Sequence, residues 1–163
     1  MSVPEASGQI AARDSSLQAW VALFLRVAIG AGFLSAVADR FGIWGPAGTP
    51  SVAWGNFQSF LAYTATLNPW CPAKLIPVLG WLATCAETVL GVALILGFQI
   101  RIAALLSGAL TLCFALAMTF TLGVHAPLNF SVFVCAAGSF LLAICGGDRW
   151  SVDALVVKGK RSE

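Results

Sequence analysis

Four long apolar stretches, separated by shorter polar or glycine-containing segments, dominate the pattern of residues along the chain. They cover residues 17–38, 77–98, 101–122 and 128–145, and the fourth is the shortest. At a rise of about 1.5 Å per residue, about 20 helical residues cross a hydrocarbon core of about 30 Å. The pattern therefore predicts an all-α membrane protein in which four transmembrane helices form one bundle.

The segments outside these stretches divide the chain further. Residues 1–16 are small and polar and predict a cytoplasmic tail, and residues 146–163 predict a second, basic tail. Residues 17–145 would then form the transmembrane domain, with residues 39–76 as its longest loop. A cleaved signal peptide is an alternative for the first stretch, but Arg26 interrupts its apolar run, so we favour an uncleaved helix.

The loop 39–76 carries a pattern of its own. Apolar residues at Trp54, Phe57 and Leu61 recur at helical spacing. Ser51 suits the N-cap of such a helix, and Asn68-Pro69 suits its end. Aromatic side chains concentrate in the same loop, as they do where a membrane meets water. We therefore expect an interfacial amphipathic helix in this loop.

Composition and charge favour an inner-membrane protein. Only 10% of the residues are charged, against about a quarter in soluble domains. The net charge of +2 argues against nucleic-acid binding. Lys and Arg near the helix ends predict cytoplasmic termini and a periplasmic 39–76 loop. The cytoplasmic set is Arg13, Arg101, Arg149, Lys158, Lys160 and Arg161, against Arg40 and Lys74 outside.

Two charged residues lie deep inside apolar stretches and are the main site candidates. Arg26 lies well within the first stretch and Glu87 near the middle of the second. Because an isolated charge at the bilayer centre costs at least ~2.5 kcal/mol, such residues face the bundle interior and pair. We therefore expect Arg26 to meet Glu87 between the first two helices. Thr84 and Gly91 share the helix face of Glu87 and complete this intramembrane polar pocket.

The same pair supports two interpretations. In the first, it is a structural ion pair that fixes how the two helices dock. In the second, it lines a pocket that binds a polar head group, such as a quinone, or relays a proton.

Secondary candidates lie at the helix ends and in the loops. Asp39 and Arg40 end the first helix, and Arg40 is available to an anionic lipid or ligand. His125 is the only histidine and cannot form a metal site alone. Of the five cysteines, Cys71 is the one outside the apolar runs, and no metal or disulfide framework is indicated.

The order of these residues resembles the DoxX family of bacterial membrane proteins. The stretch 86–101, with Glu87, Gly91, Gly97 and Arg101, is similar to the family's pattern at the junction of helices two and three. Arg26, Gly30 and Phe33 are similar to the family's opening pattern, whereas Asp39-Arg40 stands where the family often has a lysine. The resemblance covers residues 20 to 145.

The resemblance implies a four-helix inner-membrane bundle associated with quinone-linked oxidoreductases. The expected function is that of an accessory subunit of a membrane redox system, with quinone as ligand and a redox protein or a second copy as partner. Haem-ligand pairs, CxxC pairs and nucleotide-binding loops are missing from the sequence, so electron transfer would need a partner's cofactor. The alternatives are a structural scaffold or assembly factor and, less favoured, a small carrier.

Overall fold

The computed structural model describes residues 3–146 and 151–152, with side chains described from Ser16 onward. Within these residues the fold is all-helical and contains no strand, which confirms the predicted class. The α-helices are α1 (Val3–Arg40), α2 (Phe57–Leu67), α3 (Ile76–Leu96), α4 (Ile100–Leu122), α5 (His125–Asn129) and α6 (Val132–Cys145), and a 3-10 turn, η1 (Ala73–Leu75), precedes α3.

Three helical segments are long and apolar enough to cross a membrane. They are Ser16–Arg40 within α1, Ala73–Leu96 and Ile100–Leu122, and they indicate a multi-pass membrane protein. The fourth predicted span corresponds to α5 and α6. Since α6 has 14 residues, it extends about 21 Å, which is less than the hydrocarbon core of about 30 Å.

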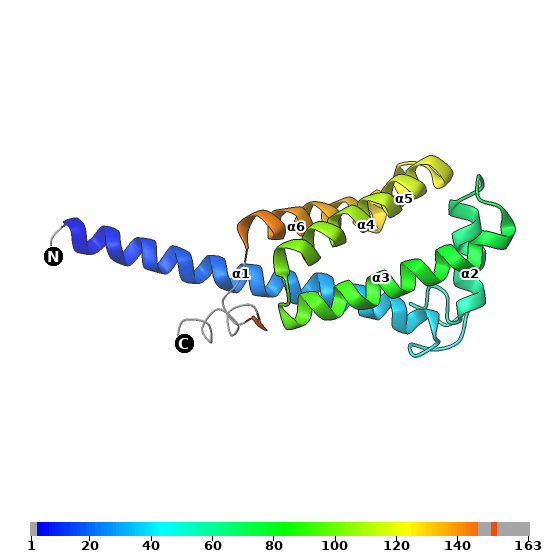
Figure 1. Cartoon of the computed structure of the whole chain (residues 1–163), viewed down its shortest axis with the longest axis horizontal. Coiled ribbons are helices and arrows are strands. Elements are labelled where there is room, and N and C mark those ends of the chain that lie inside the picture. The colour runs from blue at the N-terminus through cyan, green and yellow to red at the C-terminus, as the bar shows by residue number, and fades with distance from the viewer. Residues whose placement is uncertain (1–2, 147–150, 153–163) are drawn as a thin grey trace.

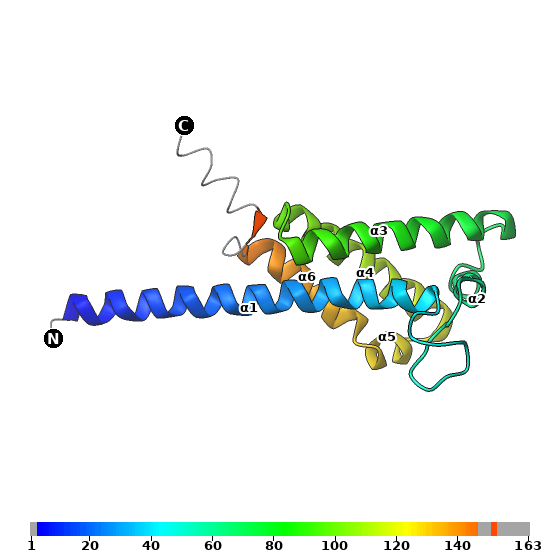
Figure 2. The same ribbon diagram turned by 90° about the horizontal axis from the view of Figure 1, so that it is seen from below.

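The helices associate as two pairs that are joined at one end. Figures 1 and 2 show α1 beside α3, and α4 beside α6. α2 lies across the far end of this arrangement, roughly perpendicular to α3, and contacts α3 and α4 (Figure 1). The amino-terminal part of α1 extends beyond the other helices on the opposite side.

α1 is longer than the predicted span because it begins at Val3, inside the predicted polar tail. Pro4 suits a first helical turn, since its missing N–H would have no partner there. Ala6, Ala11 and Ala12 are strong helix formers and explain why the helix continues through this polar segment. Of the predicted basic tail, only Gly146, Ser151 and Val152 lie within the described residues.

The predicted loop helix exists as α2, but its predicted start is wrong. Ser51 has a φ of 71° and lies in a turn, whereas Oδ1 of Asn56 accepts a hydrogen bond from the amide of Ser59 at 2.8 Å. Asn56 is therefore the N-cap, because its side chain satisfies an amide that has no partner within the helix. The end before Asn68-Pro69 is as predicted.

Small residues set the closest approach between the helices. A Cβ atom on Gly30 of α1 would lie 2.8 Å from the carbonyl oxygen of Gly91 on α3. A Cβ atom on Gly108 of α4 would lie 2.7 Å from the ring of Phe140 on α6. Glycine at these crossings lets the backbones pack closely, which compensates for the weak hydrophobic drive between helices in lipid.

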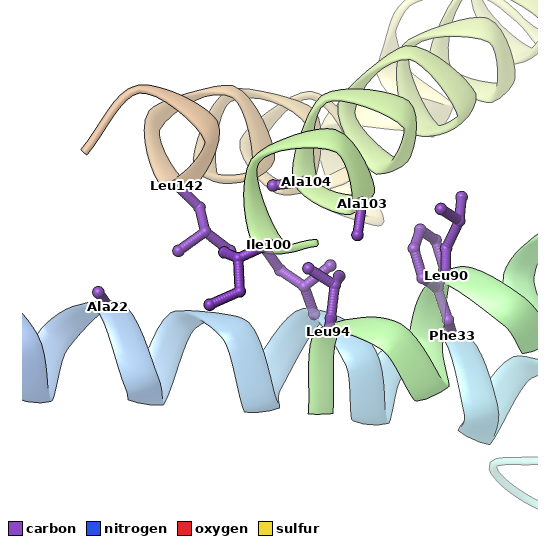
Figure 3. Packing of buried hydrophobic residues seen from close by; sticks show 9 residues of the cluster. Ala22, Phe33, Leu90, Leu94, Ile100, Ala103, Ala104 and Leu142 are labelled. Carbon is purple, nitrogen blue, oxygen red and sulfur yellow. The ribbon is translucent and has the colours of Figure 1, made fainter. Parts of the chain in front are cut away.

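The apolar core lies where the two pairs meet. Leu94 of α3, Ile100 of α4 and Leu142 of α6 are nearly fully buried there, facing Ala22 of α1 (Figure 3). Phe33 and Leu90 extend this core along the α1–α3 pair. The core thus holds the pairs together near the α3–α4 turn, and polar residues concentrate farther along α1 and α3.

Candidate functional site

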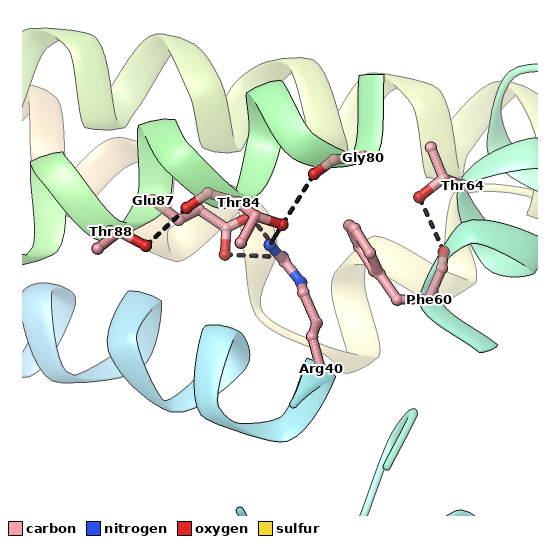
Figure 4. Close-up of polar contacts among 7 residues, drawn as sticks. All are labelled: Arg40, Phe60, Thr64, Gly80, Thr84, Glu87 and Thr88. Carbon is pink, nitrogen blue, oxygen red and sulfur yellow. Dashed lines mark hydrogen bonds and ion pairs between the residues drawn. The ribbon is translucent and has the colours of Figure 1, made fainter. Parts of the chain in front are cut away.

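Arg40, the last residue of α1, forms the centre of a buried polar cluster (Figure 4). Its Nη2 lies 2.6 Å from Oε1 and 2.7 Å from Oε2 of Glu87. Its Nη1 donates to Oγ1 of Thr84 at 2.9 Å. Arg40 is 3% exposed and Glu87 1%, so this is an ion pair removed from solvent. In such a setting each charge depends on the other for compensation.

The helix geometry of α3 explains how the acceptors are presented. Thr84 and Glu87 are three residues apart and therefore share one face of α3. The Thr84 hydroxyl donates to the carbonyl oxygen of Gly80 at 2.8 Å, which orients its lone pairs toward Arg40 (Figure 4). The hydroxyl of Thr88, one turn farther, donates to the carbonyl oxygen of Thr84 at 2.7 Å and makes no bond to the guanidinium.

Aromatic rings cover the guanidinium from the side of α2. The Cζ atom of Arg40 lies 3.9 Å from the ring centroid of Phe60 and 5.4 Å from that of Trp54. Both are cation–π contacts, which strengthen when the cation is desolvated. The ring centroid of Trp54 lies 5.3 Å from that of Phe60, in an edge-on arrangement, and 6.1 Å from that of Tyr63. Burial raises the pKa of Tyr63. The cluster therefore joins α1, α2 and α3.

Asp39 ties the loop before α2 to the end of α1. Its Oδ2 accepts hydrogen bonds from the backbone amides of Ala53 at 3.1 Å and Trp54 at 2.8 Å. Asp39 is 5% exposed. Within the described part of the chain, its other oxygen, Oδ1, and the Nε atom of Arg40 are buried and make no hydrogen bond. The cluster thus holds one uncommitted acceptor and one uncommitted donor.

The predicted pairing of Arg26 with Glu87 is wrong. Glu87 binds Arg40, and Arg26 lies at the level of the turn that follows α3. A Cβ atom on Gly97 would lie 2.6 Å from Nη1 of Arg26 and 2.6 Å from Cβ of Ser151. The guanidinium therefore packs against the α3–α4 turn rather than at the centre of the bundle. The physical reason is the stagger of α1 along α3, which brings its last turn level with Glu87.

The remaining candidates lie apart from the cluster. Gly91 shares the buried face of α3, but its neighbours are Gly30 and Leu34 of α1 rather than polar groups. His125 is exposed on α5 and is hydrogen-bonded through Nδ1 to Asn129 at 3.1 Å. Cys71 is half-buried in the loop before η1. Across the residues that the structure describes, no three His, Cys, Asp or Glu side chains form a group that would hold a metal ion.

Sequence reasoning did not assign Trp54 and Phe60 to the site. The signal was present, because aromatic residues crowd the loop that follows Asp39-Arg40. A loop anchored at the end of α1 can place such rings over a terminal arginine.

Comparisons with known proteins add no further assignment. No family model, no curated protein and no solved structure matches the chain.

Proposed function

We propose that the chain is a DoxX-type inner-membrane protein that crosses the bilayer four times, with α5 and α6 together forming the fourth crossing. α6 packs along α4, and α5 continues toward the end of the bundle where α2 lies (Figure 1). Arg101 approaches Gly146 at the opposite end, where a Cβ atom on Gly146 would lie 3.9 Å from Arg101 Nε. The positive-inside rule favours this end as the cytoplasmic one.

In this proposal the protein is an accessory subunit of a quinone-linked redox system, and the Arg40 cluster binds the quinone head group. The observation that carries it is the pair of buried, uncommitted polar atoms, Arg40 Nε and Asp39 Oδ1, in a cluster lined by aromatic rings. Buried polar atoms without partners are costly, and a redox or binding role is one explanation for them. They are also the two kinds of group that a quinone and its reduced form engage.

The donor and acceptor suit such a head group chemically. The Nε–H of Arg40 would donate to a carbonyl or hydroxyl oxygen, and Oδ1 of Asp39 would accept from a hydroxyl. Trp54 is half-buried and offers an apolar ring face, whereas the face of Phe60 is covered by the Arg40 guanidinium. A bound quinone would supply two-electron redox chemistry, and these residues would bind and orient it.

A structural role for the cluster is the second candidate, because both Glu87 oxygens and both Nη atoms of Arg40 already have partners within the bundle. One network joins both oxygens of Glu87, two nitrogens of Arg40 and the hydroxyl of Thr84. It links three helices and is closed to solvent. A scaffold for a partner protein would need only this rigidity.

A carrier is less favoured. The buried hydroxyls of Ser107, Thr111 and Ser139 donate to carbonyl oxygens of their own helices, so they do not line a hydrophilic path.

The deciding experiment measures quinone retained by the purified protein. The wild type and the Arg40→Gln and Glu87→Gln variants would be purified with native lipid, and bound quinone would be quantified by mass spectrometry. We expect the wild type to retain quinone and each variant to lose most of it at equal expression. Lys74→Gln, an exposed charge beside α3, is the matched control and should retain quinone.

Absence of quinone from the wild type would overturn the binding role. If both single variants misfold and the double variant Arg40→Gln/Glu87→Gln folds without changing retention, the pair is structural alone.

A further inference from the structure

The uncommitted polar atoms of the cluster differ in kind, and this difference bears on which ligand they select. Oδ2 of Asp39 already accepts from two backbone amides, whereas Oδ1 accepts from no described residue. A carboxylate oxygen only accepts hydrogen bonds, so its complement must donate one. A ligand with carbonyl oxygens alone leaves this buried acceptor unsatisfied, which is costly.

The formal charge of the cluster points in the same direction. Arg40 and Glu87 form one buried ion pair, and Asp39, the residue before Arg40 on α1, adds a second buried carboxylate that binds two backbone amides. An anionic ligand would meet an excess of negative charge, and a cation would compete with Arg40 for Glu87. The complement is therefore a neutral group that donates a hydrogen bond, such as a hydroxyl.

Trp54 contacts both Asp39 and Arg40. Its backbone amide donates to Asp39 Oδ2 at 2.8 Å, and its ring lies 5.4 Å from Arg40 Cζ. The uncommitted atoms thus belong to two side chains that both contact the same tryptophan.

We propose that this site binds a neutral, hydroxyl-bearing amphiphile in preference to its carbonyl counterpart, with Asp39 as the residue that sets the preference. The inference rests on the proposed function, in which the two forms are a hydroquinone and a quinone. The same chemistry would accept the glycerol hydroxyls of a neutral lipid.

The test compares dissociation constants in detergent micelles by titration calorimetry under anaerobic conditions. The probes are a short-chain ubiquinone analogue, its hydroquinone and the di-O-methyl ether of that hydroquinone. For the wild type we expect the hydroquinone to bind at least ~10-fold tighter than the other two, since one hydrogen bond to a charged group is lost in each. The ether matters because it keeps the ring and removes only the donor.

The Asp39→Asn variant gives the sharper test of this preference. Its amide oxygen can still accept from the Ala53 and Trp54 amides, while its NH2 replaces the Oδ1 acceptor by a donor. We expect the hydroquinone-to-quinone preference to fall by ~10-fold or more and to approach or pass unity. If the variant does not fold, the ether comparison on the wild type still decides.

Equal affinity of the wild type for all three probes would overturn this inference and leave the proposed function standing. Binding of none of them would overturn both. A short-chain monoacylglycerol that displaces the hydroquinone at similar affinity supports the inference, with a lipid as the source of the hydroxyl. A monoacylglycerol that does not displace the hydroquinone also supports it, and shows that the ligand needs an aromatic ring as well as a hydroxyl.

Discussion

Two buried arginines, Arg26 and Arg40, lie about four turns apart on the same face of α1, yet their surroundings differ. Arg40 binds a carboxylate and a hydroxyl on α3 under two aromatic rings. Arg26 packs against the glycine that ends α3. The difference follows from which groups of α3 lie opposite each arginine. The depth of an arginine within its apolar stretch does not determine its partner.

The comparison also separates two consequences of burying a charge. At Arg40 the charge is compensated within the bundle, so its removal leaves Glu87 buried without its partner. At Arg26 the neighbouring elements are the α3–α4 turn and Ser151, which belong to one end of the bundle. Changes at Glu87 should therefore strongly affect the packing around Arg40, and they should not affect the packing around Arg26.

The largest effect is expected at the ion pair. Arg40→Gln or Glu87→Gln alone should lower the free energy of unfolding by about 3–5 kcal/mol, because each leaves one buried charge without compensation. The measurement is an unfolding titration with SDS in mixed micelles. Lys74→Gln, which removes an exposed charge, should change it by no more than about 0.5 kcal/mol. Equal losses in all three variants would show that Arg40 has no special role.

A smaller effect is expected at the helix crossing between the two arginines. Gly30→Ala should cost about 1–3 kcal/mol, because its new Cβ atom would lie 2.8 Å from the Gly91 carbonyl oxygen and force α1 away from α3. Gly32→Ala is the matched control on the same helix, where a Cβ atom meets nothing within 4 Å. It should be neutral or stabilising by up to about 1 kcal/mol. The same titration checks both, and a cost at Gly32 equal to that at Gly30 contradicts the packing.

The smallest effect concerns the hydroxyl beside Glu87. Thr84→Val should cost about 1 kcal/mol, since it removes the acceptor for Arg40 Nη1 and keeps the shape of the side chain. Thr88→Val, one turn farther along α3, removes only a bond to the backbone of its own helix. We expect it to cost less than half as much in the same titration. A larger cost for Thr88→Val than for Thr84→Val would contradict the hydrogen bond between Arg40 and Thr84.

Much of the fold could be predicted from the sequence, because long apolar stretches, prolines and glycines act locally. The three long helices and the end of α2 before Asn68-Pro69 are of this kind. The N-cap of α2 is Asn56 instead of Ser51, because the Asn56 side chain accepts a hydrogen bond from the Ser59 amide, whereas Ser51 lies in a turn.

The candidate site was predicted only in part, because it depends on the stagger between α1 and α3. Glu87 and Thr84 could be placed on one face of α3 from their spacing alone. Their partner could not, since the choice between Arg26 and Arg40 depends on where α1 sits along α3. The glycines at positions 30 and 91 fix that position through a close contact between distant residues.

Two double-mutant cycles test this account most directly, with Glu87→Gln combined once with Arg40→Gln and once with Arg26→Gln. We expect a coupling energy of about 2–3 kcal/mol between residues 40 and 87, because they share hydrogen bonds. Between residues 26 and 87 the effects should add to within about 0.5 kcal/mol. A large coupling for Arg26 together with none for Arg40 would contradict the assignment of Arg40 as the partner of Glu87.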